Sequence, residues 1–439
     1  MYTEGKEVAA HADIHDEEQT IYIIGIKTHA RDFNTQINHT ESKELAQIVD
    51  HVEYTSVLPG NEYVLYGVLM NKATGKPLLI DGKKVLATTT FTPTESAGSV
   101  DVVFKFDASA IEGSTVVVFE TLTYRGVEVA SHQDIDDAEQ TVYIPSVKTT
   151  AISGDTKDHM TIAKGDIEIT DTVEYKGLEV GRSYVLKGVL MNRNTNVPVA
   201  VDGKNIVAET KFTAKTADGT VDVTFKFDGS KLKNTIFVAF ETLYADGKEV
   251  AAHTDLYDEE QTVYVPEIQT STKDAITEIN HTEAQAKAKI VDTVTYSALL
   301  PGKEYTLTGT LMNKATGKAI EIGGKKITAS RTFTPTEVNG TVDVTFTFDA
   351  SVLEGSTVVV FERLTHKGIE VATHEDITDA DQTVYIPKIR TTAVSDDTKD
   401  HITEAKDKIR LTDTVHYTNL ETGRKYELRA TLMDQATGN

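Results

Sequence analysis

The strongest constraint on this sequence is an acidic segment that ends in Gln-Thr-Val-Tyr or Gln-Thr-Ile-Tyr and occurs four times. Its glutamine stands at positions 19, 140, 261 and 382, so the repeat period is 121 residues throughout. A fixed period indicates tandem structural units, and a unit of this size can bury a core of its own. We therefore divide the chain into the end of a repeat (1–24), three complete repeats (25–145, 146–266 and 267–387) and the start of another (388–439).

The joints between repeats are short, and three of them contain proline, at Pro145, Pro266 and Pro387. Proline restricts the backbone, and no Gly/Ser linker is present, so we expect stiff joints and a rod-like array in which each repeat has its neighbours as partners. The repeats also alternate. The sequence INHTE occurs at 37–41 and 279–283, whereas DTKDH occurs at 155–159 and 397–401. This pattern indicates that a block of two repeats was duplicated.

Within each repeat the hydrophobic pattern is that of β-strands. Val100–Phe106 and Ser114–Leu122 are rich in β-branched and aromatic residues with a period of two. Turn dipeptides such as Pro59-Gly60 and Asp81-Gly82 separate the runs. About eight short strands per repeat without a convincing helix predict an all-β fold of tandem immunoglobulin-like sandwiches.

Composition excludes several classes of function. The net charge of −24 opposes binding to nucleic acid or to an anionic membrane. No apolar run is long enough to insert into a bilayer, and the absence of Cys rules out disulfides. We expect no cofactor and no metal, and we expect export and anchoring signals to lie outside this segment.

Each complete repeat carries four polar residues on strand faces that are otherwise apolar. Alternate side chains share a face, so Thr28 lies with Ile26, and Asp50 lies with Val52. Burying such groups without partners costs several kcal/mol each, so the four should meet one another. The sets are Thr28, Asp50, Glu120 and Gln140; Thr149, Asp171, Glu241 and Gln261; and Thr270, Asp292, Glu362 and Gln382.

A histidine stands eight residues before each glutamine of the complete repeats, at His132, His253 and His374. In a regular strand with alternating side chains, this histidine would not lie on the face that carries the preceding valines. We therefore expect it just beyond the end of that strand, at the rim of the fold.

These residue types permit acyl transfer. Threonine supplies a hydroxyl nucleophile, the glutamine carboxamide supplies the electrophilic carbon, and the histidine can act as general base. A close Asp/Glu pair in an apolar site should share a proton and stabilise the developing oxyanion. Ammonia would leave, and an ester would join the first strand to the last. The reaction would occur once in each repeat, so we do not expect a turnover enzyme.

Several alternatives stay open. A Lys–Asn isopeptide bond needs a lysine on the first strand, and Gln269 and Arg390 replace Lys27 and Lys148 in two of the four copies. Buried polar groups without covalent chemistry, repeats rigidified by calcium, and a ligand-binding adhesin module are the others. The acidic residues before each glutamine vary in position (Glu17, Glu18; Asp137, Glu139; Asp379, Asp381), which favours a solvated loop over a calcium site.

The sequence resembles a known family. Val238-Ala239-Phe240-Glu241 matches the motif that names the VaFE repeat-containing surface-anchored proteins. The combination of Ile-x-Thr, Asp-x-Val-x-Tyr, this motif and His-x7-Gln is similar to the immunoglobulin-like (CnaB-like) domains of Gram-positive adhesins with autocatalytic Thr–Gln ester cross-links.

The resemblance implies the bonds Thr28–Gln140, Thr149–Gln261 and Thr270–Gln382, assisted by the Asp, Glu and His residues. It also implies a secreted structural shaft of an adhesin or pilus-like protein, held at the bacterial cell wall by regions outside this segment. Neither end of the sequence should cross-link, because Gln19 and His11 lack their threonine, and Thr391 and Asp413 lack their glutamine.

Overall fold

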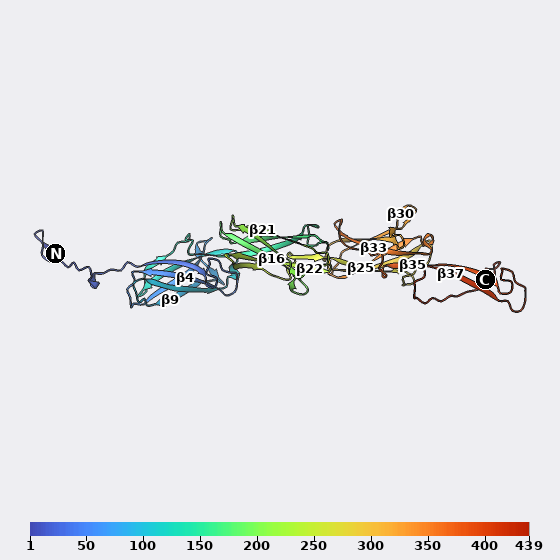
Figure 1. Cartoon of the computed structure of the whole chain (residues 1–439). Coiled ribbons are helices and arrows are strands. Elements are labelled where there is room, and N and C mark those ends of the chain that lie inside the picture. The colour runs from blue at the N-terminus through green and yellow to red at the C-terminus, as the bar shows by residue number, and fades with distance from the viewer. Residues whose placement is uncertain (439) are drawn as a thin grey trace. The chain divides into compact units, whose positions relative to one another are not determined.

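The computed structural model describes residues 1–438 and consists mainly of β-strands (Figure 1). The helical elements of this part are three short 3₁₀ turns, η1 (Glu17–Gln19), η2 (Ser109–Ile111) and η3 (Ala350–Leu353). The chain divides into two compact units. One comprises residues 1–151, 170–225 and 238–261, and the other comprises residues 152–169, 226–237 and 262–439. Repeat 25–145 lies wholly in the first unit and repeat 267–387 wholly in the second.

Repeat 25–145 contains two large antiparallel sheets and a small hairpin of β7 (Leu79–Ile80) and β8 (Lys83–Lys84). The first has the order β10-β4-β3, and the second is built on the order β12-β11-β5-β6, with β9 paired to β5 and β13 paired to β11. The first sheet consists of β3 (Gly25–Asp32), β4 (Ala46–Thr55) and β10 (Gly98–Phe106). The second consists of β5 (Tyr63–Asn71), β6 (Lys76–Pro77), β9 (Leu86–Phe91), β11 (Ser114–Tyr124), β12 (Val127–His132) and β13 (Thr141–Ile144).

The core of this repeat lies between the two sheets. Ile48 and Val52 of β4 and Leu65, Val118 and Leu122 of the second sheet are completely buried and belong to one hydrophobic cluster. Every second residue of β4 faces this cluster, which is the alternation expected when a sheet packs on one face only. The predicted all-β fold of tandem sandwiches is confirmed.

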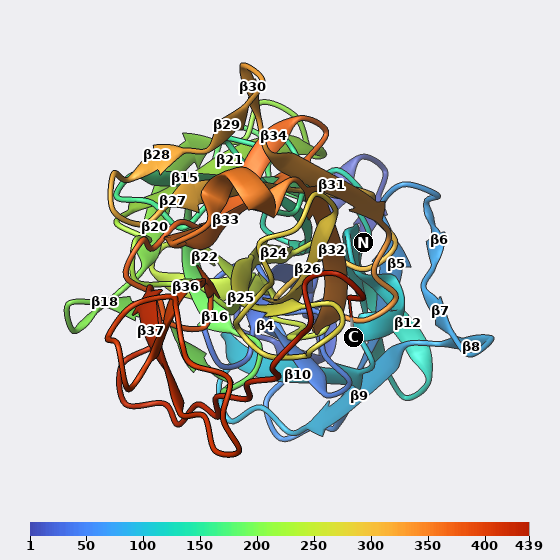
Figure 2. The same ribbon diagram turned by 90° about the vertical axis from the view of Figure 1, so that its right-hand side faces the viewer.

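The same strand orders recur in the other two complete repeats. In repeat 267–387, β26 and β32 pair along their whole length and lie side by side in Figure 2. Its strands are β25 (Glu267–Asp274), β26 (Ala288–Ser297), β27 (Tyr305–Asn313), β28 (Lys318–Ala319), β29 (Glu321–Ile322), β30 (Lys325–Lys326), β31 (Thr328–Phe333), β32 (Gly340–Phe348), β33 (Ser356–His366), β34 (Ile369–His374) and β35 (Thr383–Ile386). Those of repeat 146–266 are β14 (Ser146–Ser153), β15 (Ile167–Lys176), β16 (Ser183–Asn192), β17 (Val197–Pro198), β18 (Ala200–Val201), β19 (Lys204–Asn205), β20 (Val207–Thr213), β21 (Gly219–Phe227), β22 (Thr235–Ala245), β23 (Lys248–His253) and β24 (Thr262–Val265).

The first and last strands of a repeat lie next to each other. The backbone N–H of Ala30 donates to the carbonyl of Glu139 at 2.8 Å, and the N–H of Thr40 donates to the carbonyl of Tyr143 at 3.0 Å. A parallel bridge between His39 and Tyr143 completes the contact. Residues more than 100 positions apart are thereby brought together at one edge of the sandwich.

The partial repeats at the two ends are largely exposed. Gln19 lies in η1 and is exposed. Thr391 and Asp413 lie on β36 (Lys388–Ser395) and β37 (Leu411–Thr418), which pair with each other, and both residues are exposed. Within residues 1–438, no helix has the length and apolar character needed to cross a membrane.

Candidate functional site

The predicted Thr–Gln pairs are in direct contact in all three complete repeats. Nε2 of each glutamine donates a hydrogen bond to Oγ1 of the threonine 112 residues earlier, and this N–O distance is 2.7 Å for Gln261–Thr149 and for Gln382–Thr270. Gln140 makes the same contact with Thr28. All six side chains are buried. The structure therefore brings the two members of each predicted pair together.

Backbone hydrogen bonds hold each glutamine from both sheets. In the first repeat, the carbonyl of Gln140 accepts from Val118 N–H of β11 at 3.1 Å, while the preceding residue accepts from Ala30 N–H of β3 at 2.8 Å. In the second repeat, the backbone N–H of Ala239 donates to the carbonyl of Gln261, and the N–H of Ala151 donates to the carbonyl of Glu260. In the third repeat, Val360 N–H donates to the carbonyl of Gln382, and Thr272 N–H donates to the carbonyl of Asp381. The glutamine is thus held between the two sheets, in contact with the threonine.

The Asp and Glu of each set come from opposite sheets and are completely buried. Asp50 lies on β4, directly opposite Ala30 of β3, and Glu120 lies on β11 of the second sheet. Burial, followed by the nearby Asp50 charge, raises the pKa of Glu120 to about 9. The same causes raise the pKa of Glu241 to about 11 and that of Glu362 to about 10, and burial raises the pKa of Asp50 to about 7. Burial also raises the pKa values of Asp171 and Asp292.

A neutral glutamic acid fits the hydrogen bonding of this site. Within residues 1–438, no N–H or O–H group makes a hydrogen bond of good geometry with either carboxyl of the Asp50/Glu120 pair, and Gln140 Oε1 also lacks a donor. Two ionised carboxylates would offer each other only acceptors, whereas a proton shared by the pair lets one carboxyl donate to the other. The sequence-based expectation of a shared proton agrees with the direction of the pKa shifts.

The histidine faces the same side of the sheet as the glutamic acid. His132 is the last residue of β12 and lies directly opposite Glu120 of β11, and the pairs Glu241–His253 and Glu362–His374 repeat this register. The prediction that the histidine lies beyond the strand end is wrong, although its half-buried position fits the predicted rim. The cause is a register shift in the pairing of β11 with β12, between Leu122 and Thr123. Such a bulge reverses the alternation of side chains along the strand, so the histidine lies on the opposite face from the one that a regular strand predicts.

An aspartate of the acidic segment orients each histidine. Asp137 Oδ2 lies 2.8 Å from His132 Nε2, and the distances are 3.2 Å for Asp258–His253 and 2.9 Å for Asp379–His374. The prediction of a merely solvated loop is wrong for these residues. The sequence carried the signal, since an aspartate stands three positions before every glutamine, at 16, 137, 258 and 379.

The hydrogen bond from Nε2–H to the aspartate determines which ring nitrogen is available as a base. It leaves Nδ1 as the unprotonated nitrogen of a neutral imidazole. Nδ1 of His253 and of His374 is buried and has no hydrogen-bond partner in the described part of the chain. A proton acceptor therefore stands on the core side of the ring.

Comparison with known proteins agrees with this geometry. The sequence matches the family described as "T-Q ester bond containing domain" over residues 1–23, 24–144, 145–265, 266–386 and 387–439. The chain belongs to this family. The resemblance to Thr–Gln ester domains that was inferred from the motifs is confirmed.

Two solved structures illustrate more distant similarity. A bacterial adhesin from Mobiluncus mulieris, described as containing intramolecular disulfide, isopeptide and ester bond cross-links, is 15% identical over 62% of this chain and 97% of its own, with a TM-score of 0.24. A putative β-galactosidase from Bacteroides fragilis is 12% identical over 54% of this chain and 36% of its own, with a TM-score of 0.21. The search among curated proteins returned no match.

A glycine makes room for the carboxyl pair in each of the three complete repeats. Gly188 of β16 packs against Glu241, and a Cβ atom there would lie 2.7 Å from Glu241 Oε2 and 2.5 Å from Phe225. Gly67 and Gly309 hold the same place in the other repeats. A glycine inside a strand at a period of 121 residues was a readable sign of close approach that the sequence analysis missed.

Repeat 267–387, the third complete repeat, has an additional hydroxyl at the site. Thr272 Oγ1 donates a hydrogen bond of 2.7 Å to Asp292 Oδ1, and both side chains are buried. Alanine stands at this position in the other two complete repeats, at Ala30 and Ala151. The carboxyl environment of the third domain is therefore more polar than that of its neighbours.

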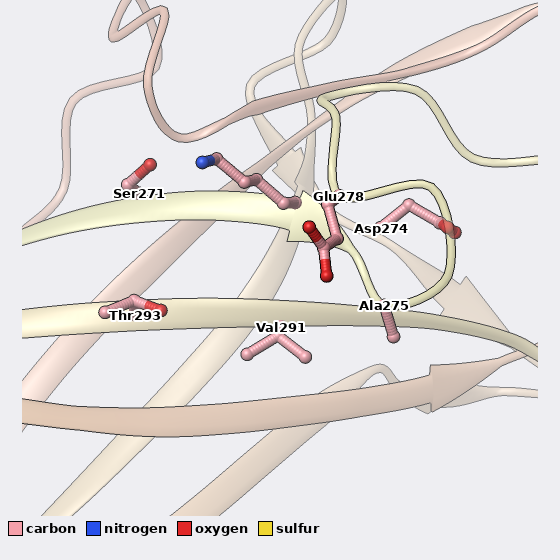
Figure 3. Close-up of a pocket in the computed structure, with 7 residues that line it drawn as sticks. Ser271, Asp274, Ala275, Glu278, Val291 and Thr293 are labelled. Carbon is pink, nitrogen blue, oxygen red and sulfur yellow. The ribbon is translucent and has the colours of Figure 1, made fainter.

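The surface groove in Figure 3 does not belong to this site. It is lined by Ser271 and Lys273 of β25 together with Glu278 and Val291. Because side chains alternate along a strand, these two β25 residues face away from Thr270. Within residues 1–438, no three His, Cys, Asp or Glu residues are grouped so that they could hold a metal ion.

Proposed function

We propose that this chain is a structural stalk segment of a bacterial cell-surface adhesin, and that each complete repeat closes its own Thr–Gln ester bond. The observation that carries the proposal is the contact of three buried Thr–Gln pairs across 112 residues each, every pair beside a buried Asp/Glu pair. Membership in the T-Q ester bond domain family supports the bond. The Mobiluncus mulieris protein, described as a bacterial adhesin, suggests the wider role.

In the proposed reaction of the second repeat, Thr149 Oγ1 attacks the side-chain carbonyl carbon of Gln261. His253 accepts the hydroxyl proton through Nδ1, while Asp258 holds the ring through Nε2. The neutral carboxyl of Glu241 donates a hydrogen bond to the developing oxyanion. The carbon–nitrogen bond then breaks, the leaving amide nitrogen takes the proton from His253, and ammonia departs. The products are one ester and one ammonia.

The reaction would not be enzymatic turnover, because the glutamine that reacts is consumed. Each repeat carries one threonine, one glutamine and one set of assisting residues. The product is a permanent link between β14 and the residue that precedes β24. The proposed role of the chemistry is therefore mechanical and not metabolic.

The bond would lie where a pulling force passes. Force along the chain enters a repeat at its first strand and leaves at its last, and these strands are neighbours. With the bond formed, force bypasses the 112-residue span between the linked residues. Without it, an unfolding repeat could release roughly 370–400 Å of chain. The proposed stalk would resist extension, and its rod-like form, Gram-positive origin and cell-wall attachment belong to the same proposal.

Intact mass under denaturing conditions tests the bond. We expect the full chain to be lighter than its sequence by three ammonia molecules, and the Thr149→Ala variant to be lighter by two. Thr150→Ala is a matched control, because the neighbouring hydroxyl faces the other side of β14 and should leave the deficit at three. A mass equal to the plain sequence would reject the ester and would favour repeats held only by non-covalent contacts.

A further inference from the structure

The alternation of the repeats has a structural counterpart in the loop that follows the first strand. We call repeats 25–145 and 267–387 type A, and repeat 146–266 and the start of a repeat at 388–439 type B. Type A carries Asn-His in this loop, at Asn38-His39 and Asn280-His281. The complete type B repeat carries Asp158-His159-Met160 one period later. These residues face the next repeat, so the difference can decide what each repeat binds.

The type A loop makes a directional hydrogen-bond network with type B residues in the first compact unit. His39 is buried, and its Nε2 lies 2.7 Å from the Tyr184 hydroxyl. That hydroxyl accepts from Glu179 N–H at 2.9 Å, so its own proton points to His39. Asn38 Oδ1 accepts from Arg182 at 2.8 Å and from His39 Nδ1 at 3.0 Å. Burial, with the Arg182 charge, lowers the pKa of His39 to about 3, which keeps the ring neutral as this network requires.

The same network recurs 242 positions later, in the second compact unit. His281 Nε2 lies 2.9 Å from the Tyr426 hydroxyl, which accepts from Glu421 N–H at 2.8 Å. Arg424 donates to Asn280 at 2.8 Å and also bonds Glu421 at 2.8 Å. The recurrence of the same hydrogen bonds in both compact units indicates a specific interface between neighbouring repeats.

The complete type B repeat meets type A residues through different chemistry. Lys367 Nζ donates to Asp158 Oδ2 at 2.7 Å, and His366 Nε2 lies 3.5 Å from the same oxygen. The Tyr305 hydroxyl lies 2.9 Å from Met160 Sδ. Burial acts to raise the pKa of Asp158, but the bond from Lys367 and other nearby donors and charges lower it to about 2, so this carboxylate is charged.

The receiving residues change together with the loops. Where type A has Leu300, Lys303 and Lys367, type B has Glu179, Arg182 and Asp246 at the positions one period earlier. If a type B loop met a type B end, Asp158 would face Asp246 in place of Lys367, and like charges would repel. If a type A loop met a type A end, Asn38 would lose both Glu179 and Arg182. Each wrong pairing carries a penalty that the native order avoids.

We propose that the two types of repeat carry two matched pairs of end surfaces, so that each end accepts only a repeat of the other type and each joint is held in one arrangement. The partner of each surface is the neighbouring repeat of this chain. These contacts match each repeat to a neighbour of the other type, independently of the ester bonds inside the repeats.

Pairs of spin labels in the full chain test this proposal, because the sequence has no native cysteine. Lys105, Lys211, Lys226 and Thr347 are exposed strand residues that can be replaced by labelled cysteines. Labels at 105 and 211 report on the His39 joint in the first compact unit, and labels at 226 and 347 report on the Asp158 joint in the second. We expect a narrow distance distribution for both pairs in the otherwise unchanged chain.

Charge reversal at one joint gives the decisive comparison. Asp158→Lys should broaden the 226–347 distribution and leave the 105–211 distribution unchanged, and Lys367→Asp added to it should restore the narrow distribution. Asp158→Asn, which keeps the size of the side chain, should broaden it less. An unchanged distribution in Asp158→Lys, or a broadening that Lys367→Asp does not reverse, overturns the proposal. The ammonia deficit of the same samples reports separately on the ester bonds.

Discussion

Gln261 Nε2 lies 2.7 Å from Thr149 Oγ1, although the two residues are 112 positions apart. Thr149 lies on β14 of one sheet, and Gln261 directly precedes β24 of the other. Both side chains are buried, and the backbone around Gln261 is hydrogen-bonded to both sheets. The contact is therefore a property of the folded sandwich. A covalent bond formed there would fasten the start of the repeat to its end.

Loss of one bond should destabilise one repeat. Closing a loop near this length removes about 4–5 kcal/mol of unfolded-state entropy by analogy with a disulfide. We expect Thr149→Ala to unfold the second repeat at a lower denaturant concentration than the others, as followed by hydrogen exchange with mass spectrometry. Thr150→Ala should unfold like the unchanged chain. Equal protection of the second repeat in both variants would contradict a stabilising role for the bond.

The buried glutamic acids predict a pH dependence of stability once the bonds are absent. In the folded state burial raises the pKa of Glu120 from 4.5 to about 9, so the folded chain binds a proton that the unfolded chain releases between these values. Stability from this group is complete below the unfolded pKa and is lost as the pH rises through the folded value. The variant with Thr28→Ala, Thr149→Ala and Thr270→Ala should therefore become easier to denature as the pH rises.

Glutamine substitutions supply the control for this pH dependence. Replacing Glu120, Glu241 and Glu362 by glutamine in the triple threonine variant removes the three titrating carboxyls. We expect the denaturation midpoint to vary less with pH in this range. A midpoint that falls as steeply as before would show that other groups cause the dependence.

Asp258 should affect the rate of bond formation in the second repeat. Its contact with His253 Nε2 fixes the tautomer in which Nδ1 accepts the proton. Because a positioned general base contributes about 10²–10⁴-fold to a rate, Asp258→Asn should slow ammonia release by about tenfold or more. Time-resolved mass spectrometry of freshly synthesised chain measures this, with the first and third repeats as internal references. Asp255→Asn, in the same acidic segment, should leave the rate unchanged.

Because of Thr272, ammonia release in the third repeat should depend on pH differently from ammonia release in the other two. Its hydroxyl donates to Asp292, which stabilises the ionised form and lowers the pKa of that carboxyl relative to burial alone. We expect Thr272→Ala to shift the pH dependence of ammonia release in the third repeat towards that of the first. The reciprocal variant, Ala30→Thr, should shift the first repeat towards the third. Unchanged profiles in both variants would assign Thr272 a packing role only.

Much of the fold and site followed from the sequence because strand side chains alternate with a period of two. Thr28, Asp50, Glu120 and Gln140 each broke an apolar face, and the cost of burying them alone required that they meet. The repeat period added independent copies of the same pattern. These arguments needed no knowledge of which strands pair.

Other features depended on tertiary structure. The bulge between Leu122 and Thr123 turns His132 towards Glu120, and a regular alternation cannot anticipate such a shift. The roles of Asp137 and Gly67 require knowing which strands are neighbours. The alternation of the repeats was plain in the sequence, but only the structure brought Asp158 to Lys367 and His39 to Tyr184. Sequence periodicity determines which face a side chain occupies, whereas strand register and the packing of one repeat on the next determine what that face meets.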